Sequence, residues 1–444
     1  MDKELAAKYA EHLSKMLQCE TVNDSSVGMA DTSEKFSAFH SQLKQLYPLT
    51  FERLERIPLG DALLLHWRGQ DPDRPAIVLM SHSDVVAATG QWKYPPFSGE
   101  IDDDCIWGRG AVDTKGSLCA IFEAVEALIS EDFTPACDVY ISSSNNEEPL
   151  GDGAVKAVQY FVDNDIKLDM VSDEGGAVIE SPLPGTHGFV SMLGIVEKGY
   201  ANVRFTAKSS GGHASTPPKN TPIARLAAFV DHMEKHPPFV SRFTPTVEKM
   251  FKTVAPHMSF KYRFLFGNLW LFKPLLLKLL PKVSDQASAM LRTTCVFTMA
   301  EGSLAANIIP DSASVTANIR FIMHQPMDES LALIRSIADK YGIETEVLYA
   351  HDCSTLTDTD DKRFHYIQEC ATAVFPEAVA VPCVMLGGTD ARHFATHCPC
   401  TVRFMPMILN NQQLSSVHGL DENLSVDALA RAVEFYTLLV RNYL

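Results

Sequence analysis

The chain has 444 residues, of which 46% are hydrophobic and 21% charged, a composition that is ordinary for a soluble globular protein and excludes disorder as its main state. The 55 acidic residues outnumber the 38 basic ones and give a net charge of −17, which argues against nucleic-acid binding as the main function. At about 100–200 residues per domain, the length predicts two or three domains, or one large domain with an insertion.

The ten cysteines are scattered along the chain and form no Cys-x-x-Cys pair, which excludes the usual zinc-ribbon and thioredoxin patterns. Free thiols in a reducing compartment are therefore expected. The chain opens on an amphipathic helix, predicted over residues 2–18, and this segment lacks the apolar core of a signal peptide. We predict a cytoplasmic protein.

The first part of the chain alternates short apolar runs with segments of helical periodicity, which is typical of an α/β sheet. Strands are predicted over residues 51–68, 76–80, 138–142 and 170–171, and helices over residues 116–130 and 153–162. Residues 76–80 read Ala-Ile-Val-Leu-Met, a run expected of a strand that is buried on both faces of its sheet.

Polar side chains that can bind metal follow several of these predicted strands. They are His82, Asp84, Asp113, Glu147, Glu148 and Asp173. Because open α/β sheets bind ligands beyond the carboxyl ends of their strands, we expect these side chains to converge on one rim. Imidazole nitrogen and carboxylate oxygen are ligands that zinc takes when thiolates are absent. Each motif alone also fits an ordinary surface or turn, so their ordered recurrence is what favours a metal site.

Local patterns indicate a different role for each of these residues at the predicted metal site. Asp84 lies two positions after His82, so in an extended segment it faces the same way and can fix the tautomer of the imidazole. Asp113 follows a glycine-rich turn, where the backbone can bend sharply. Glu147 and Glu148 are adjacent at a strand end and point in different directions, so one can bind metal while the other faces a substrate.

From residue 188 the pattern changes to that of an α+β insertion. Its strands are predicted at residues 189–193, 200–207, 293–299 and 313–322, and its helices at residues 222–234 and 327–341. Strands at residues 344–349 and 379–385 and a final helix at residues 426–439 are assigned to a returning α/β domain.

One apolar segment requires a membrane test. Residues 264–280 read FLFGNLWLFKPLLLKLL, but Lys273 and Pro274 interrupt the run and Pro281 ends it. A spanning helix needs about 20 apolar residues, so no membrane span is predicted. The favoured interpretation is a buried helix pair or a contact surface, and the alternative is an exposed patch for a partner or an apolar substrate.

Five short motifs occur in a fixed order along the chain: His82-Ser-Asp84, Trp107-Gly-Arg-Gly-Ala-Val-Asp113, Asn146-Glu147-Glu148, Ser172-Asp173-Glu174-Gly175 and Gly211-Gly-His213-Ala-Ser215. Together they resemble the M20 metallopeptidases, a family that includes aminoacylase-1, carboxypeptidase G2, carnosinases and succinyl-diaminopimelate desuccinylase. The resemblance covers about residues 5–440. Residues 92–99 and 293–310 look most like the carboxypeptidase S and N-acyl-amino-acid hydrolase branch.

The resemblance implies an α/β catalytic domain with a central mixed sheet, formed by residues 1–187 and 324–444 and interrupted by a smaller α+β lid at residues 188–323. It also implies two divalent ions, zinc by default, with manganese or cobalt as alternatives. The metal ligands it implies are a bridging Asp113, His82 and Asp173 on one ion, and Glu148 and His418 on the other. His418 is chosen over His393 and His397 because a glycine and an acidic pair follow it.

The remaining roles come from the same resemblance. Glu147 is implied as the general base, and a cis peptide is expected at Asp113–Thr114. His213 is implied as a donor to the oxyanion of the tetrahedral intermediate, and a buried structural histidine is its alternative.

Three further residues are predicted to contact the substrate. Asn307 is a second candidate oxyanion donor, and a turn-forming role is its alternative. Arg392 is preferred to Arg320 for binding a substrate carboxylate, because a guanidinium binds both oxygens and Arg392 lies in a glycine-rich loop.

The predicted function is hydrolysis of the amide bond of a small peptide or N-acyl amino acid that carries a free carboxylate. The alternatives are an aminopeptidase on the same scaffold and a non-catalytic metal-binding homologue. The lid of many family members dimerises, and both a homodimer and a monomer remain open for this chain.

Overall fold

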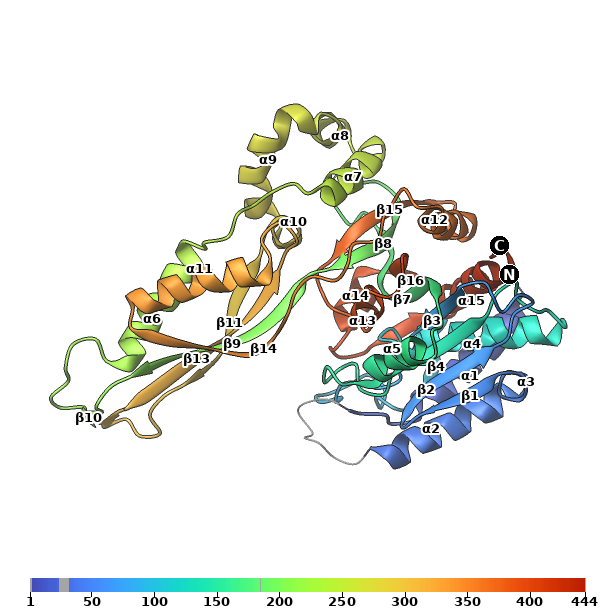
Figure 1. The fold of residues 1–444 in the computed structure, drawn as a ribbon, viewed down its shortest axis with the longest axis horizontal. Helices are drawn as coiled ribbons and strands as arrows, with labels where there is room; N and C mark the ends of the chain where they lie inside the picture. The colour runs from blue at the N-terminus through green and yellow to red at the C-terminus, as the bar shows by residue number, and fades with distance from the viewer. Residues whose placement is uncertain (1, 24–31, 184, 444) are drawn as a thin grey trace.

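The computed structural model describes residues 2–23, 32–183 and 185–443. Figure 1 shows two parts, a layered α/β domain that holds both termini and an elongated lid that extends away from it. The predicted fold class, α/β with a central mixed sheet, is confirmed.

The α/β domain is built on an eight-stranded sheet in the order β1-β2-β6-β3-β7-β16-β8-β15. In that order the strands are Glu55–Leu59, Ala62–Trp67, Val139–Ser143, Ala76–Met80, Leu168–Glu180, Thr401–Leu409, Phe189–Glu197 and Ala378–Met385. Strand β3 pairs in parallel with both β6 and β7, whereas β1, β2 and β6 pair antiparallel. All five residues of β3 are buried, as the apolar run at residues 76–80 predicts.

Helices cover both faces of this sheet. On one face lie α1 (Lys3–Leu17), α2 (Ser33–Leu46), α3 (Pro48–Arg53), α4 (Lys115–Ser130), α12 (Lys362–Val374) and α15 (Val426–Arg441). On the other lie α5 (Gly153–Asp163) and α13 (Ala391–Phe394). Alternate residues of β3 enter the two cores, since Ile77 and Leu79 belong to the first and Val78 and Met80 to the second. A small sheet of β17 (Asn423–Ser425), β5 (Cys105–Trp107) and β4 (Glu100–Asp102) flanks the domain.

The lid is a four-stranded antiparallel sheet in the order β11-β13-β9-β14, with its own hydrophobic core. In that order the strands are Thr294–Glu301, Ser312–Phe321, Gly199–Lys208 and Ile343–His351. Helices α6 (Pro222–Lys235) and α11 (Met327–Lys340) pack on it, and β10 (Gly212–His213) pairs with β12 (Ile308–Ile309) at its far end (Figure 1).

Two predicted strands change place relative to the sequence-based boundaries. Strand β8 pairs with β15 and β7, so it belongs to the large sheet, and the lid sheet begins at Gly199 rather than at residue 188. Strand β14 pairs with β9, so the lid continues to His351 rather than ending at residue 323. Strand pairing between distant segments sets both boundaries, and the local sequence pattern does not contain it.

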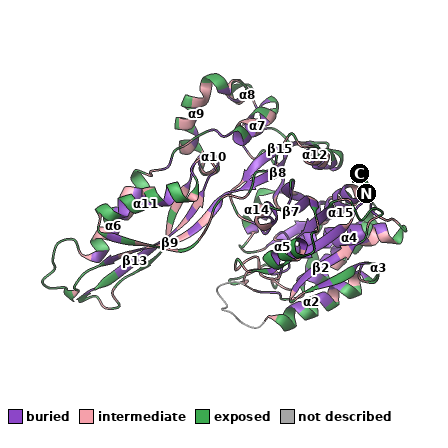
Figure 2. Cartoon of the chain, in the orientation of Figure 1, coloured by how far each residue is buried: buried purple, intermediate pink, exposed green. Residues whose placement is uncertain are grey.

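A helical segment inside the predicted lid packs elsewhere. It comprises α7 (Pro245–Val254), η1 (Ala255–His257), α8 (Phe260–Gly267), α9 (Leu269–Val283) and α10 (Asp285–Leu291). Its buried residues join the core of the α/β domain, and Figure 2 shows that α8 and α9 also present exposed surface. Among the described residues no single helix meets the length and hydropathy required to cross a membrane, although α8 and α9 meet them as a pair bent by 110°.

Candidate di-metal active site

The metal-binding candidates meet beyond the carboxyl ends of neighbouring parallel strands. His82 follows β3, Glu147 and Glu148 follow β6, and Glu174 lies within β7. These strands are adjacent in the order β6-β3-β7, so their ends reach the same rim. Asp113 reaches this rim from the loop before α4. The predicted convergence of segments about 30 residues apart is therefore present in the fold.

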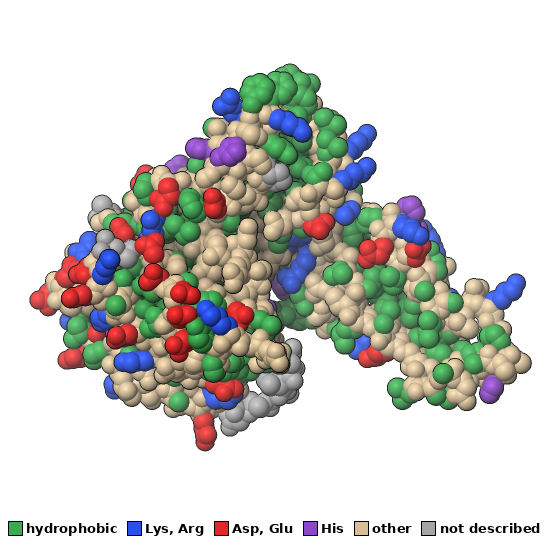
Figure 3. Space-filling view, turned by 180° about the vertical axis from the view of Figure 1, so that it is seen from behind, with side chains coloured by type: hydrophobic (Ala, Val, Ile, Leu, Met, Phe, Trp, Pro, Cys, Tyr) green, Lys and Arg blue, Asp and Glu red, His purple; other side chains and the backbone are tan. Residues whose placement is uncertain are grey.

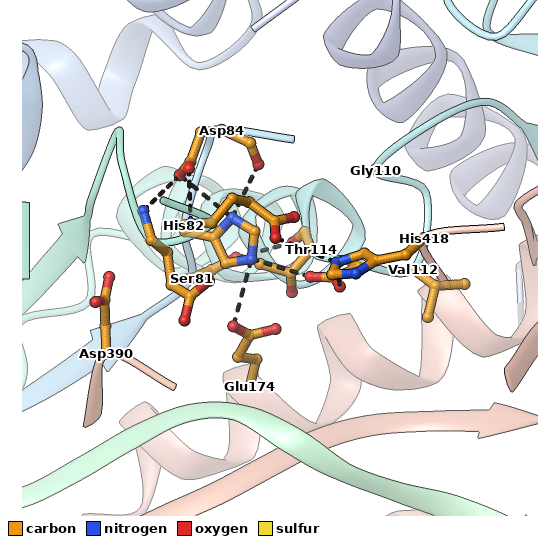
Figure 4. Close-up of polar contacts among 12 residues, drawn as sticks. Ser81, His82, Asp84, Gly110, Val112, Thr114, Glu174, Asp390 and His418 are labelled. Carbon is orange, nitrogen blue, oxygen red and sulfur yellow. Dashed lines mark hydrogen bonds and ion pairs between the residues drawn. The ribbon is translucent and has the colours of Figure 1, made fainter. Parts of the chain in front are cut away.

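Asp113 lies between the imidazoles of His82 and His418, two residues that are labelled in Figure 4. Its Oδ1 is 2.9 Å from Nε2 of His82, and its Oδ2 is 3.1 Å from Nε2 of His418. One carboxylate that offers a different oxygen to each of two histidines has the arrangement needed to bridge two cations. The peptide bond Asp113–Thr114 is cis, as expected.

The other carboxylates complete two groups of possible ligands, one of His82, Asp113 and Glu148 and one of His82, Glu147 and Glu174. Oε2 of Glu148 is 3.2 Å from Nε2 of His418. Its Oε1 is buried and has no hydrogen-bond partner among the described residues. A buried carboxylate oxygen without a partner is costly, so this atom suits a cation. The donor set of imidazoles and carboxylates therefore fits two divalent ions.

The structure brings Glu174, and not the predicted Asp173, close to the imidazole of His82. Oε1 of Glu174 is 3.3 Å from Nε2 of His82, whereas Oδ2 of Asp173 accepts a hydrogen bond from the backbone N–H of Ala391. Adjacent residues of a strand point to opposite faces, so only one of the two can reach the rim. Burial raises the pKa of Glu174 to about 8, against the opposing effect of His82.

Asp84 holds the other parts of the cluster in place. It is fully buried, and its two oxygens accept the backbone N–H groups of Glu147 and Glu148 at 3.1 and 3.0 Å. Nδ1 of His82 is 2.9 Å from the backbone oxygen of Asp84 and 3.4 Å from its Oδ1. Asp84 therefore fixes both the tautomer of His82 and the position of the glutamate pair, which suits a positioning role.

Glu147, the candidate base, is buried beside the metal ligands. Burial raises its pKa well above the usual value, and Asp390, Glu174 and Glu148 act in the same direction. Nη1 of Arg392 is 3.9 Å from its Oε1. A carboxylate with a raised pKa is suited to take up and then release a proton near neutral pH.

Arg392 is available for a further polar group. Its Nη1 donates to the backbone oxygen of Thr389 at 2.8 Å, while its buried Nε has no hydrogen-bond partner among the described residues. Arg320, in the lid strand β13, lies with its guanidinium 4.5 Å from the ring centre of Tyr200. Burial, and to a smaller extent the charge of Arg392, lowers the pKa of Arg320. Both arginines thus remain candidates to bind a substrate carboxylate.

Glu422 is a site residue that the sequence analysis did not assign. Its buried carboxylate accepts hydrogen bonds from the backbone N–H groups of Gly110, Val112 and Asp113 and from Nη1 of Arg109 at 2.7 Å. It therefore ties the Asp113 loop to the segment that carries His418. The acidic pair at residues 421–422 was the available signal, but the sequence does not give its partner.

The lid residues do not join the cluster. His213 is exposed in β10, where its Nδ1 is 2.7 Å from Oγ of Ser215, and Asn307 is exposed beside it and accepts the N–H of Ala214 through its backbone oxygen. Figure 1 shows β10 at the end of the lid that is farthest from the large sheet. The alternative of a buried structural His213 is excluded by its exposure, and its predicted contact with the reacting groups is not present in this arrangement.

Comparison with known protein families identifies the family of this chain. The family model described as peptidase family M20/M25/M40 matches residues 78–442. The chain belongs to this family. This M20 chain is a hydrolytic enzyme, as its family and its relatives indicate.

Three proteins illustrate what the M20 enzyme is similar to. A probable carboxypeptidase S-like 2 of Dictyostelium discoideum is 32% identical over 98% of this chain and 84% of its own length. The human N-fatty-acyl-amino acid synthase/hydrolase PM20D1 is 31% identical over 84% of this chain and 75% of its own length. The M20 metallo-carboxypeptidase Sso-CP2 of Sulfolobus solfataricus has the same fold, with a TM-score of 0.70 at 19% identity over 99% of both chains.

Proposed function

We propose that the enzyme hydrolyses the amide bond of N-acyl amino acids or small peptides that carry a free carboxylate, with two zinc ions in the rim cluster. The observation that carries this proposal is Asp113, whose two oxygens face His82 and His418 separately. We assign His82, Asp113 and Glu174 to one ion, and Asp113, Glu148 and His418 to the other. Manganese or cobalt fits the same donors.

Two bound ions supply Lewis-acid polarisation of the carbonyl and lower the pKa of water at the site. The residues of the chain supply the rest. Glu147 accepts a proton from the attacking water and donates it to the leaving nitrogen as the C–N bond breaks. Its raised pKa suits both transfers. Asp84 keeps Glu147 in place through the backbone N–H at 3.1 Å.

Recognition of the substrate carboxylate is assigned to Arg392, with Arg320 as a second donor from the lid. The unpaired Nε of Arg392 and its place beside Glu147 support this assignment. A bidentate contact would place the carboxylate at a fixed distance from the base, and this selects substrates with a terminal carboxyl group. An aminopeptidase would instead need an acidic group to bind a free amine. Substitution of Arg392 therefore distinguishes the two activities.

An apolar cavity next to the cluster supports a substrate with an apolar group. Its volume is about 270 Å³, and its lining includes Gly175, Met192, Met290, Met385 and Leu414. Gly175 directly follows Glu174, and Leu414 lies four residues before His418. The name of the human relative, an N-fatty-acyl-amino acid hydrolase, agrees with an apolar acyl group in this cavity.

The state of the thiols supports a cytoplasmic location for the enzyme. All ten cysteines are free, and six of them are buried, which supports a reducing, cytoplasmic environment.

The test is reconstitution of metal-free protein with Zn²⁺, Mn²⁺ or Co²⁺, followed by a panel of N-acyl amino acids of increasing acyl length, dipeptides, and their C-terminal amides. We expect activity only with metal, two ions per chain by mass spectrometry under native conditions, and a preference for free carboxylates. Equal turnover of the amides would refute carboxylate recognition, and turnover of aminoacyl amides alone would favour the aminopeptidase. Full metal loading without turnover of any substrate would favour the non-catalytic homologue.

A further inference from the structure

Helices α8 and α9 expose several large apolar side chains. We call this set the α8–α9 ridge and define it as Phe264, Trp270, Leu271, Leu275, Leu279 and Val283. The last four residues recur every four positions, so they form one stripe along α9. Trp270 is 78% exposed and Val283 is 67% exposed. Single exposed apolar residues are common, but a contiguous stripe of this kind marks a contact surface.

The same two helices are anchored by a separate buried stripe. Phe266, Leu269, Leu276 and Leu280 are at most 6% exposed and belong to the core of the α/β domain. The ridge is therefore the outward face of a firmly packed element. None of the described residues covers it, since its members stay exposed.

The charge around the ridge differs from that of the rest of the chain. Residues 260–283 contain Lys261, Arg263, Lys273, Lys278 and Lys282 and no acidic residue, although the whole chain carries a net charge of −17. Lys273 is paired with Glu248. The other four are exposed and have no ion pair with a described carboxylate. Figure 3 shows hydrophobic side chains gathered at the top of the molecule with Lys and Arg at their margins.

Apolar side chains with tryptophan, flanked by lysine and arginine, have the composition of helices that lie in a membrane interface. Helix α9 has 15 residues, so it is about 22 Å long and shorter than the roughly 30 Å hydrocarbon core. The bend of 110° between α8 and α9 turns the pair into a shallow wedge. Insertion to a depth of about 5–10 Å suits such an element.

We propose that the α8–α9 ridge docks the enzyme onto the surface of an anionic lipid bilayer. The ridge residues enter the interface, and Lys261, Arg263, Lys278 and Lys282 contact the headgroups. A second copy of this chain is a poorer occupant, because a two-fold contact through the ridge would bring two unpaired basic clusters together.

The ridge also connects to the apolar cavity. Helix α10 follows α9 directly, and its residues Gln286 and Met290 line that cavity. Docking therefore places the cavity close to the lipid surface. On the proposed function, this favours amphipathic substrates that partition into membranes, although lipid binding itself does not depend on that function.

The test is flotation of the full-length protein with vesicles of phosphatidylcholine containing 30 mol% phosphatidylserine, and with phosphatidylcholine alone. We expect flotation with the anionic vesicles that decreases as salt is raised. L275E/L279E should abolish it, and K278S/K282S should reduce the partition coefficient about thirtyfold. The matched controls L304E and K340S alter an exposed leucine and an exposed lysine of the lid and should leave flotation unchanged.

Fluorescence gives a second measurement. The emission of Trp270, isolated by subtracting W270F, should shift to shorter wavelength with anionic vesicles. Absence of flotation by the unmodified protein, or flotation that L275E/L279E does not affect, would overturn the proposal. A monomer–dimer change in L275E/L279E without vesicle binding would also overturn it and assign the ridge to self-association. Hydrolysis of a water-soluble substrate by L275E/L279E should remain unchanged. Failure of the lipid-docking proposal is therefore distinguishable from failure of the proposed hydrolysis.

Discussion

The rim of the large sheet and the tip of the lid were both expected to contribute to one active site. In the fold the candidate residues of the rim converge, whereas those of the lid tip stay apart from them. At the rim, five ligand candidates form two groups of three that share His82, and Asp84 and Glu422 hold them through buried hydrogen bonds. At the tip, His213 and Asn307 are exposed and contact only their own hairpin.

The candidate metal site at the rim is already assembled in the fold, whereas any catalytic role of the lid tip depends on a movement of the lid or on a second copy. At the rim the candidate donors already converge, so metal binding there requires no movement of the lid. The lid tip can assist catalysis only if the lid of the same chain closes or the lid of a second copy supplies it. Metal binding and turnover should therefore respond differently to changes in the two regions.

The largest effect is expected for Glu147→Gln. Loss of the proton shuttle should lower kcat by about a thousandfold while two ions per chain remain bound. Turnover and metal content should be measured on the same sample. The neighbouring Glu148→Gln is the matched control, because it should lose metal as well as activity. Undiminished turnover of Glu147→Gln would exclude Glu147 as the base.

The next effect concerns the lid. His213→Ala should lower kcat by roughly 10²- to 10³-fold, as expected for loss of an oxyanion donor, with metal content unchanged. The exposed His236→Ala, in the same lid, is the control. A mixture of His213→Ala and Glu147→Gln should recover part of the activity if the lid of one copy serves another. Recovery should be absent if the lid closes within one chain, and an active His213→Ala would remove the lid from the chemistry.

A smaller effect is expected for Glu422→Gln. The Asp113 loop would lose an anionic acceptor for three backbone N–H groups, so metal affinity should fall about 10- to 100-fold. Competition with a chelator measures this affinity. Asp421→Asn is the control, because Asp421 accepts the N–H of Lys93 and not that of the loop. Equal affinities of the two variants would show that the rim does not depend on this connection.

The smallest effect is expected for Arg392→Lys. Replacing the planar fork by an ammonium should raise KM about tenfold for substrates with a free carboxylate and leave their amides unaffected. The same change at Arg320 tests which arginine dominates. If only Arg320→Lys raises KM, the lid binds the substrate carboxylate. Substrate recognition then depends, like the role of His213, on the position of the lid. If neither substitution raises KM, the aminopeptidase remains.

The sequence predicted where the candidate ligands gather better than it predicted which side chain faces His82 from β7. The apolar run of β3 and the polar residues after successive strands predicted that His82, Asp113, Glu147 and Glu148 lie at one edge, because the carboxyl ends of parallel strands in an α/β sheet meet there. The sequence pointed to Asp173 as a ligand, whereas in the fold its neighbour Glu174 faces His82, because the position of each side chain depends on which face of β7 it occupies. That face is set by pairing with β3 and β16, which lie far away in the chain.

The lid shows the same limit on a larger scale. Strands at residues 189–193 and 344–349 were correctly predicted as strands and assigned to the wrong sheets, since their partners are non-local. The apolar run at residues 264–280 satisfied both of its interpretations, because one stripe of α9 is buried and the opposite stripe is exposed. Helical periodicity marks the faces of a helix, but not the neighbour that each face meets.

The contacts of Glu422 have a consequence for biosynthesis. They join positions 109–113 to a carboxylate more than 300 residues later, in the same segment that supplies His418. A polypeptide still emerging from the ribosome therefore lacks the candidate ligand His418 and the anchor of the Asp113 loop until residues 418–422 have been made and can fold back. Premature termination upstream of His418 would leave an incomplete centre, so hydrolysis should require that translation has passed residue 422.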